Sequence, residues 1–154
     1  AAEQAHARDV PPYASVQNRY SVLTRDPETN GVFDACRRLG IAFVPYFPLE
    51  SGLLTGKYRQ GEELPEDARL TKWGERASSF IDDAKLAVVE RLTAWAADHG
   101  RTLLELALGW QTSNPLTATV IAGGTKPEQV RANAAAGAWR LTPEERDEVA
   151  GLTR

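Results

Sequence analysis

Short strand-like runs alternate with helical patterns along most of this chain. The runs lie at residues 14–18, 41–45 and 118–121, and each is followed by a segment with apolar residues at helical spacing. A strand followed by a helix, repeated in this way, predicts βα units and a parallel sheet. Three such units cannot close a barrel alone, because a TIM barrel needs eight strands. An isolated sheet of this size would have long open edges, which predict aggregation.

Helix start and stop signals define the two longest predicted helices. Asp26 as N-cap with Pro27 at the first position predicts a helix that runs through Cys36 to Gly40, where glycine ends it. A second helix is predicted over residues 79–99. Its apolar face would consist of Ile81, Ala84, Val88, Leu92 and Trp95.

Three further helices are predicted in the last third of the chain. Thr102 with Glu105, and Thr142 with Glu145, form two capping boxes, in which each side chain satisfies a backbone N–H of the first turn. Between these two helices, a third should follow Gly123-Gly124-Thr125 and run through Val130 and Ala134.

Composition indicates an ordinary globular protein. Of the 154 residues, 42% are hydrophobic and 25% are charged, and the net charge of −3 is spread along the chain, which argues against a nucleic-acid partner. The one cysteine, Cys36, excludes an internal disulfide and a cysteine metal cluster, and it lies on an apolar helical stripe, so we expect a core residue. No apolar run is long enough to span a membrane, so we expect a cytoplasmic protein.

Two segments suggest more than a closed small domain. The chain opens without methionine in a helix-like stretch at residues 1–8, which we interpret as the end of a helix that begins elsewhere. Residues 57–78 form a long, charged and glycine-containing stretch around Trp73. Long loops of this kind are usually functional lids or disordered segments.

Glycine-rich loops follow the second and third predicted strands, at Ser51-Gly52 and Gly123-Gly124. In TIM barrels, the loops after the last two strands commonly form a phosphate site, and a helix N-terminus favours an anion. The alternative is that both are simple turns that need a glycine in the left-handed conformation. The residues alone leave both interpretations open.

Four segments in order resemble the aldo-keto reductase superfamily. They are Val16 to Ser21, Gly40-Ile41 followed by Tyr46 to Tyr58 (with the run Pro-Leu-x-x-Gly-Leu-Leu-Thr-Gly-Lys-Tyr), Ala107 to Trp110, and Ile121 to Asn133. The resemblance implies an α/β fold that is the C-terminal portion of a (β/α)8 TIM barrel, from the sixth strand to the closing helices. Residues 1–154 would then be a partial NADP-dependent oxidoreductase domain whose N-terminal part is missing.

The resemblance assigns cofactor-binding roles to residues at the strand ends. Gln17 would hydrogen-bond the nicotinamide carboxamide, and the ring of Tyr46 would stack on the nicotinamide. Without the resemblance, a solvated glutamine at the barrel rim and a core aromatic would be the simpler interpretations. The loop around the pyrophosphate would comprise Pro48, Leu49, Ser51 and Leu53.

The third predicted strand and its helix would bind the other half of NADP(H). The resemblance implies a 2′-phosphate site at Gly123, Thr125 and Lys126, with adenine contacts from Gln129 and Asn133. Three positions depart from the family pattern: Phe47 replaces a frequent serine, Ala132 a frequent glutamate, and Gln129 an arginine of some branches. Phe47 would remove a hydroxyl donor and Ala132 an adenine contact, and Gln129 leaves the preference for NADP over NAD open.

The resemblance implies that a tyrosine, a lysine, an aspartate and a histidine on earlier strands carry out the chemistry. None of these four catalytic residues is expected in this chain. We therefore predict no catalytic residue and no metal ligand in the chain, and no activity of the chain alone. The intact protein would reduce a small aldehyde or ketone with NADPH. Two alternatives remain: a non-catalytic nucleotide-binding or regulatory subunit of the same fold, as some relatives associated with potassium channels are, and an inactive truncated product. The sequence indicates no oligomeric state.

Overall fold

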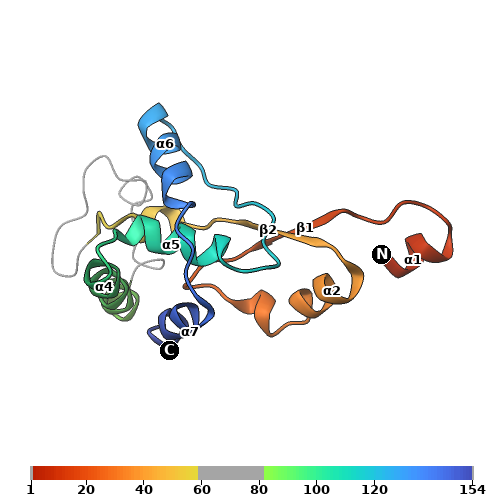
Figure 1. Cartoon of the computed structure of the whole chain (residues 1–154), viewed down its shortest axis with the longest axis horizontal. Coiled ribbons are helices and arrows are strands. Elements are labelled where there is room, and N and C mark those ends of the chain that lie inside the picture. Colours follow the sequence, from red (N-terminus) through yellow and green to blue (C-terminus); the bar gives the residue numbers. More distant parts are fainter. Residues whose placement is uncertain (1, 59–81, 154) are drawn as a thin grey trace.

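The computed structural model describes residues 2–58 and 82–153. The elements in order are α1 (Ala2–Ala7), β1 (Ser15–Arg19), the 3-10 turn η1 (Asp26–Glu28), α2 (Val32–Leu39), β2 (Ala42–Tyr46), the 3-10 segment η2 (Glu50–Thr55), α4 (Asp83–Asp98), α5 (Leu103–Thr112), α6 (Pro127–Ala136) and α7 (Pro143–Gly151). The molecule is elongated, with the two strands along its middle, α1 at one end, α2 and α7 on one side and α6 projecting from the other (Figure 1). The predicted loop around Trp73 falls almost entirely outside the described residues.

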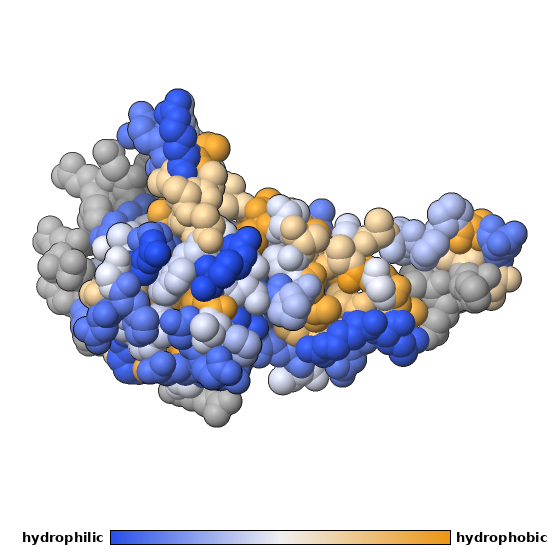
Figure 2. All heavy atoms as spheres, in the orientation of Figure 1, coloured by the Kyte–Doolittle hydropathy of each residue, from blue (hydrophilic) through white to orange (hydrophobic). Residues whose placement is uncertain are grey.

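β1 and β2 form the parallel pair that the sequence predicts. Ser15 pairs with Ala42 and Arg19 with Tyr46, and α2 lies in the connection between the two strands. This arrangement is a βαβ unit. Figure 2 shows apolar surface over these strands and between them and α2, whose outer side is hydrophilic, as expected for a short sheet with open edges.

The prediction of a third regular strand at residues 118–121 was wrong. This segment contacts β2 through two isolated bridges, Phe43 with Thr117 and Tyr46 with Ile121. Backbone bonds from Phe43 N–H to Leu116 and from Ile121 N–H to Pro45 hold it parallel to β2. Within the described part of the chain, no strand pairs with its other edge. The segment is therefore fixed at two points and is not a continuous strand.

The single helix predicted from Asp26 to Gly40 was also wrong. Pro27 lies in a short 3-10 turn, and α2 begins only at Val32, because Gly31 adopts a left-handed φ of 89° that interrupts the helix. The predicted end is confirmed: Gly40 has a φ of 62°, and its N–H donates to the carbonyl of Cys36. Left-handed backbone at this position is what favours glycine after a helix.

The helix predicted over residues 79–99 begins later than expected. The carboxylate of Asp82 accepts a 2.7 Å hydrogen bond from the N–H of Lys85 and so caps α4 at its first turn, while residues 79–81 lie outside the described part. Its buried face is displaced from the predicted one: Leu92 and Trp95 are buried, whereas Ala84 is exposed. The apolar residues that complete the face are Val89 and Ala96.

Both predicted capping boxes are confirmed. The Thr102 hydroxyl accepts from the N–H of Glu105 at the start of α5, and the Glu105 carboxylate accepts from the N–H of Thr102. Thr142 and Glu145 make the same reciprocal pair at the start of α7. The sequence signal works here because it depends only on residues three positions apart.

An aromatic cluster forms the centre of the core. The ring of Tyr20 stacks on Trp110 with centroids 5.3 Å apart, and it meets Phe33 and Phe43 edge-on, each at 5.4 Å. Cys36 is buried in the same core, and burial raises the pKa of its thiol. The prediction that Cys36 is a core residue is therefore confirmed.

α7 is fastened to this core by reciprocal hydrogen bonds. The indole Nε1 of Trp110 donates to the carbonyl of Arg146, and the Arg146 guanidinium donates to the carbonyl of Trp110, both at 3.1 Å. Arg25, from the segment after β1, donates to the carbonyl of Ala150. The C-terminal helix thereby fixes the loop that follows β1.

Candidate functional site

The segments that carry the predicted site residues end at the same edge of the sheet. Arg19 and Tyr46 are register partners at the ends of β1 and β2, and Tyr46 is bridged to Ile121. The loops that follow these three residues therefore emerge close to one another. In open α/β sheets, ligands bind outside the carboxyl ends of parallel strands.

Gln17 and Tyr46 lie on the same face of the strand pair. Gln17 is the register partner of Val44, and Tyr46 lies two residues further along β2, where the side chain points to the same side as that of Val44. Gln17 is exposed, and Tyr46 is 44% exposed. Tyr46 is therefore not part of the core that the described residues form, and its ring is accessible in this chain.

The loop after β2 has an unusual backbone. Phe47, Glu50 and Ser51 have positive φ values of 64°, 45° and 55°, and Gly52 follows with 94°. Left-handed backbone costs a residue with a side chain roughly 1–2 kcal/mol, and such strain is concentrated at ligand sites. Three non-glycine residues therefore keep a conformation here that the surrounding contacts must impose.

Ser51 and Lys57 place a hydroxyl and an ammonium group near the same turn. Ser51 is 7% exposed, and its Oγ has no hydrogen-bond partner among the described residues. The Cε and Nζ atoms of Lys57 lie only 3.1 and 3.2 Å from the place that a Cβ on Gly52 would occupy. Gly52 is required for this approach. The sequence interpretation missed Lys57, although it belongs to the Gly-Lys-Tyr end of the specific run.

Pro48, Leu49 and Leu53 position this loop by packing. Pro48 and Leu53 are buried, Leu49 is half-buried against the core, and the carbonyl of Pro48 accepts a 3.1 Å hydrogen bond from the buried amide of Gln111. Proline has no N–H to donate. The structure therefore gives Pro48 and Leu53 a packing role, and their side chains are not free to line a polar ligand site.

Glu50 is a second residue that the sequence interpretation missed. It is 3% exposed, and its carboxylate accepts hydrogen bonds from Arg19, from the hydroxyl of Ser21 at 2.7 Å and from the hydroxyl of Thr24 at 2.9 Å. These donors all belong to the end of β1 and the loop after it. No local pattern announces this contact, because the partners are 26 to 31 residues apart.

The remaining five predicted residues lie in the loop before α6 and on α6 itself. The N–H and hydroxyl of Thr125 donate to Oε1 of Gln129 at 2.9 and 3.2 Å, and the Asn133 amide donates to the carbonyl of Gly123 at 3.2 Å. Lys126 is the residue immediately before the first turn of α6. The amide side chains of the helix therefore order the loop that precedes it.

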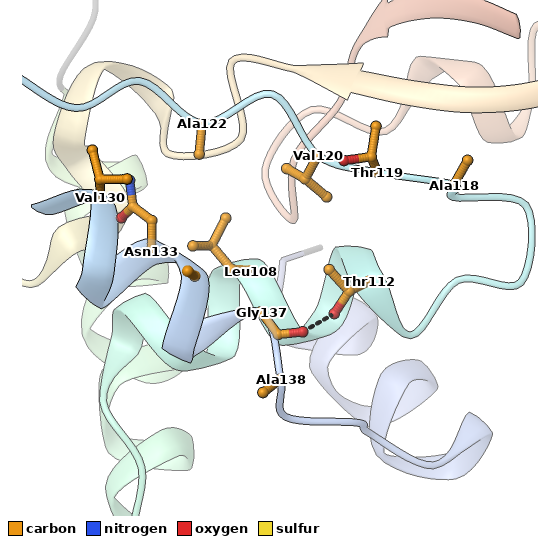
Figure 3. Close-up of a pocket in the computed structure, with 11 residues that line it drawn as sticks. Leu108, Thr112, Ala118, Thr119, Val120, Ala122, Val130, Asn133, Gly137 and Ala138 are labelled. Atoms are coloured by element: carbon orange, nitrogen blue, oxygen red, sulfur yellow. Dashed lines mark hydrogen bonds between the residues drawn. The ribbon is translucent and has the colours of Figure 1, made fainter.

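A cavity of about 420 Å³ lies beside this loop. Figure 3 shows its walls: Val120 and Ala122 from the bridged segment, Leu108 from α5, and Val130 and Asn133 from α6. Polar and apolar groups share the lining, and its polar side chains are Thr112, Thr119 and Asn133. The hollow thus offers both kinds of contact to a ligand.

Two classes of feature are missing from the described part of the chain. Residues 2–58 and 82–153 contain no group of three histidine, cysteine or acidic side chains that could hold a metal ion. None of the helices in these ranges is long and apolar enough to cross a membrane.

The fold and the candidate site are thus those of an α/β protein whose ligand site lies at the carboxyl ends of parallel strands. The chain belongs to the aldo/keto reductase family, whose model matches residues 1–154. It is 28% identical over 121 residues to L-glyceraldehyde 3-phosphate reductase of Escherichia coli K12, covering 76% of this chain and 34% of that protein.

Two further relatives differ in the function that their names state. NADH-specific methylglyoxal reductase of Escherichia coli K12 is 37% identical over 125 residues, covering 79% of this chain and 36% of the relative. A putative voltage-gated potassium channel subunit beta of Schizosaccharomyces pombe is 34% identical over 134 residues, covering 83% and 38%. The chain thus spans little more than a third of the length of the curated relatives it matches.

Proposed function

We propose that this chain is the C-terminal, cofactor-binding part of a (β/α)8-barrel aldo-keto reductase that reduces small aldehydes or ketones with NADPH. One observation carries the proposal: the exposed ring of Tyr46, the strained turn at Ser51 and the ordered loop at Thr125 all lie beyond the same strand ends. An extended dinucleotide has a ring, a pyrophosphate and a second phosphate to match these three places.

The strained turn has the chemistry of a pyrophosphate site. The Ser51 hydroxyl lacks a partner within the described residues, and Lys57 places an ammonium group over Gly52. A hydroxyl donor and a cation are the groups that phosphate oxygens require. This pyrophosphate site adds Lys57 to the residues that the sequence predicted. Pro48, Leu49 and Leu53 then support the loop by packing.

The face shared by Gln17 and Tyr46 suits the nicotinamide. The amide of Gln17 has both a donor and an acceptor for a carboxamide, and an exposed aromatic ring offers a flat platform. When bound, the reduced nicotinamide supplies a hydride. In this proposal Gln17 and Tyr46 fix which face of that ring is presented to the carbonyl carbon.

The loop before α6 suits the adenosine half. Lys126 adds a positive charge next to the N-terminus of α6, where an anion is favoured, and we propose that it binds the 2′-phosphate together with Thr125 and the backbone at Gly123. Asn133 borders the cavity and would contact the adenine, as would Gln129. One relative is named NADH-specific, so the 2′-phosphate contact is the part of the proposal that needs its own test.

The proposed reduction needs an acid to protonate the alkoxide, and none of the residues assigned here supplies one. We therefore expect the 154-residue chain to bind the dinucleotide without turning over a carbonyl substrate. The lone buried Cys36 fits a reducing compartment, so we propose a cytoplasmic protein.

The proposal is tested by titrating the chain with NADPH and with NADH. Tryptophan fluorescence and calorimetry measure the binding. We expect saturable binding of one NADPH per chain and weaker binding of NADH. ATP serves as the control, because it carries phosphates and adenine but no nicotinamide. The proposal fails if ATP and NADPH bind equally, or if neither dinucleotide binds.

A regulatory subunit is the second candidate. The potassium channel subunit beta of fission yeast and those named in Arabidopsis thaliana and Oryza sativa are 33–34% identical to this chain. Both candidates predict dinucleotide binding. They separate in the longer protein, where a reductase oxidises NADPH in the presence of an aldehyde and a purely regulatory subunit does not.

A further inference from the structure

The carboxylate of Glu50 joins two loops of the candidate site. Its three donors, Arg19, Ser21 and Thr24, all lie at the end of β1 or just after it, while Glu50 itself begins η2 after β2. Glu50 and Ser21 are almost completely buried, so these bonds form away from solvent. Hydrogen bonds to a buried charge are among the stronger ones in proteins.

The loop after β1 is itself held rigid around Ser21. The Ser21 hydroxyl accepts from the N–H of Leu23 at 3.1 Å and of Thr24 at 3.0 Å while it donates to Glu50. Backbone bonds between Ser21 and Thr24 close the same turn in both directions. Glu50 is therefore anchored to a turn that is already ordered by its own hydrogen bonds.

The anchoring coincides with the strain. Glu50 and Ser51 have φ values of 45° and 55°, and Gly52 has 94°. A non-glycine residue keeps this conformation only where its surroundings hold it. The three hydrogen bonds to Glu50 do so directly, and the position of Ser51 follows because it is the next residue.

The charge of Glu50 has to be neutralised at this place. A carboxylate close to a bound pyrophosphate would repel it, since like charges destabilise each other at short range. Arg19 forms an ion pair with Glu50, and its guanidinium also lies 5.0 Å from the centre of the Phe47 ring. The ion pair leaves the turn without net negative charge. The ammonium group of Lys57 then makes the charge near the turn positive.

We infer that Glu50 is a positioning residue that locks the turn Glu50–Ser51–Gly52 to the loop after β1 in the conformation that binds the pyrophosphate of the dinucleotide. This inference rests on the proposed function, because it assigns the pyrophosphate to that turn. Glu50 contacts no ligand itself. It acts through Ser51 and through the backbone of the turn.

The test compares two nucleotides on variants of the 154-residue chain. NADPH contains the whole pyrophosphate, whereas adenosine 2′,5′-bisphosphate carries the 2′-phosphate and only the adenosine-side phosphate of that pyrophosphate. We expect Glu50→Ala to weaken NADPH at least about tenfold, the equivalent of losing one hydrogen bond to a charge. Glu50→Gln, which keeps the shape but not the charge, should weaken it by an intermediate factor. Both changes should raise the dissociation constant of adenosine 2′,5′-bisphosphate much less than that of NADPH.

Glu28→Gln is the matched control. Glu28 is also a carboxylate that bridges an arginine and a hydroxyl, Arg25 and Tyr20, but both of these partners lie outside the turn at Ser51. It should lower thermal stability without changing either dissociation constant. If Glu50→Ala does not fold, Glu50→Gln carries the comparison alone.

The outcomes separate the two proposals. Unchanged NADPH binding in the Glu50 variants overturns the inference and leaves the proposed function intact. Equal weakening of NADPH and of adenosine 2′,5′-bisphosphate overturns it as well, because the effect would then be global. If the unmodified chain binds neither nucleotide, the proposed function fails and the inference fails with it.

Discussion

The side-chain carbonyl of Gln129 accepts two hydrogen bonds from Thr125, one from its backbone N–H and one from its hydroxyl. Gln129 lies in the first turn of α6, and Thr125 lies in the loop that precedes it. The helix thus reaches back to order its own entry loop. This contact gives Gln129 a structural task in addition to the adenine contact that we propose for it.

Changing Gln129 should separate loop order from phosphate binding. Gln129→Ala removes the acceptor, so we expect faster hydrogen exchange at the Thr125 amide and weaker NADPH binding. Gln129→Glu keeps an acceptor for both donors but adds a negative charge near the proposed 2′-phosphate site. It should leave the Thr125 amide protected and lower the affinity for NADPH more than for NADH. Equal losses for the two dinucleotides in Gln129→Glu would contradict the placement of the 2′-phosphate here.

Lys126→Ala should weaken NADPH more than NADH, since only NADPH carries the additional phosphate. Losing one charge-assisted contact costs roughly 1.5–3 kcal/mol, or about tenfold or more in the dissociation constant. Calorimetric titration with both dinucleotides measures the difference. Lys85→Ala, which removes an exposed lysine of α4, is the control and should change neither value. A loss of the same size for NADH would show that Lys126 is not at the 2′-phosphate.

Glu28 should make the stability of the chain depend on acidic pH. Burial alone would raise the pKa of this carboxyl. Hydrogen bonds from Arg25 and Tyr20 and the nearby charges of Arg25 and Arg146 outweigh that effect, so the pKa lies below its ordinary value of 4.5. A carboxyl with a lowered pKa contributes stability that is fully present above its unfolded pKa and is lost as the pH falls through the folded pKa. We therefore expect the loss of thermal stability below about pH 4.5 to be shallower in Glu28→Gln than in the unmodified chain. Identical pH profiles would exclude Glu28 as a contributor.

The sequence predicted those parts of the fold that depend on neighbouring residues. The two capping boxes and the glycine that ends α2 follow from patterns a few residues long. The parallel pair of strands followed from the order strand, helix, strand along the chain. Two predictions failed for different reasons. The left-handed backbone at Gly31 interrupts what looked like one helix after Asp26. The segment at 118–121 contacts β2 only through two isolated bridges among the described residues, and the strand-like pattern of its sequence does not reveal how far a ladder extends.

The candidate site was predicted to a similar extent. The family resemblance pointed to Gln17, Tyr46 and the loop before α6; the structure places Tyr46 at the end of β2, and Gln17 in the middle of β1 and not at its end as the sequence predicted. The resemblance gave no sign of Glu50, because this carboxylate is paired with side chains almost thirty residues away. Nor did it distinguish Ser51, whose hydroxyl lacks a partner within the described residues, from the packed Pro48 and Leu53 beside it.

Tyr46 provides the sharpest separation of a binding role from a packing role. Its ring is 44% exposed at the end of β2, whereas Phe43 on the same strand is fully buried in the aromatic cluster. Tyr46→Ala should therefore cost less than about 1 kcal/mol of stability, as surface changes usually do, while Phe43→Ala should cost about 3–5 kcal/mol. If Tyr46 stacks on the nicotinamide, Tyr46→Ala should raise the dissociation constant of NADPH and leave that of adenosine 2′,5′-bisphosphate unchanged. Tyr46→Phe keeps the ring and should bind NADPH almost as the unmodified chain does. Chemical denaturation of the free chain together with titrations of both nucleotides measures all four values, and unchanged NADPH affinity in Tyr46→Ala would rule out the stacking role.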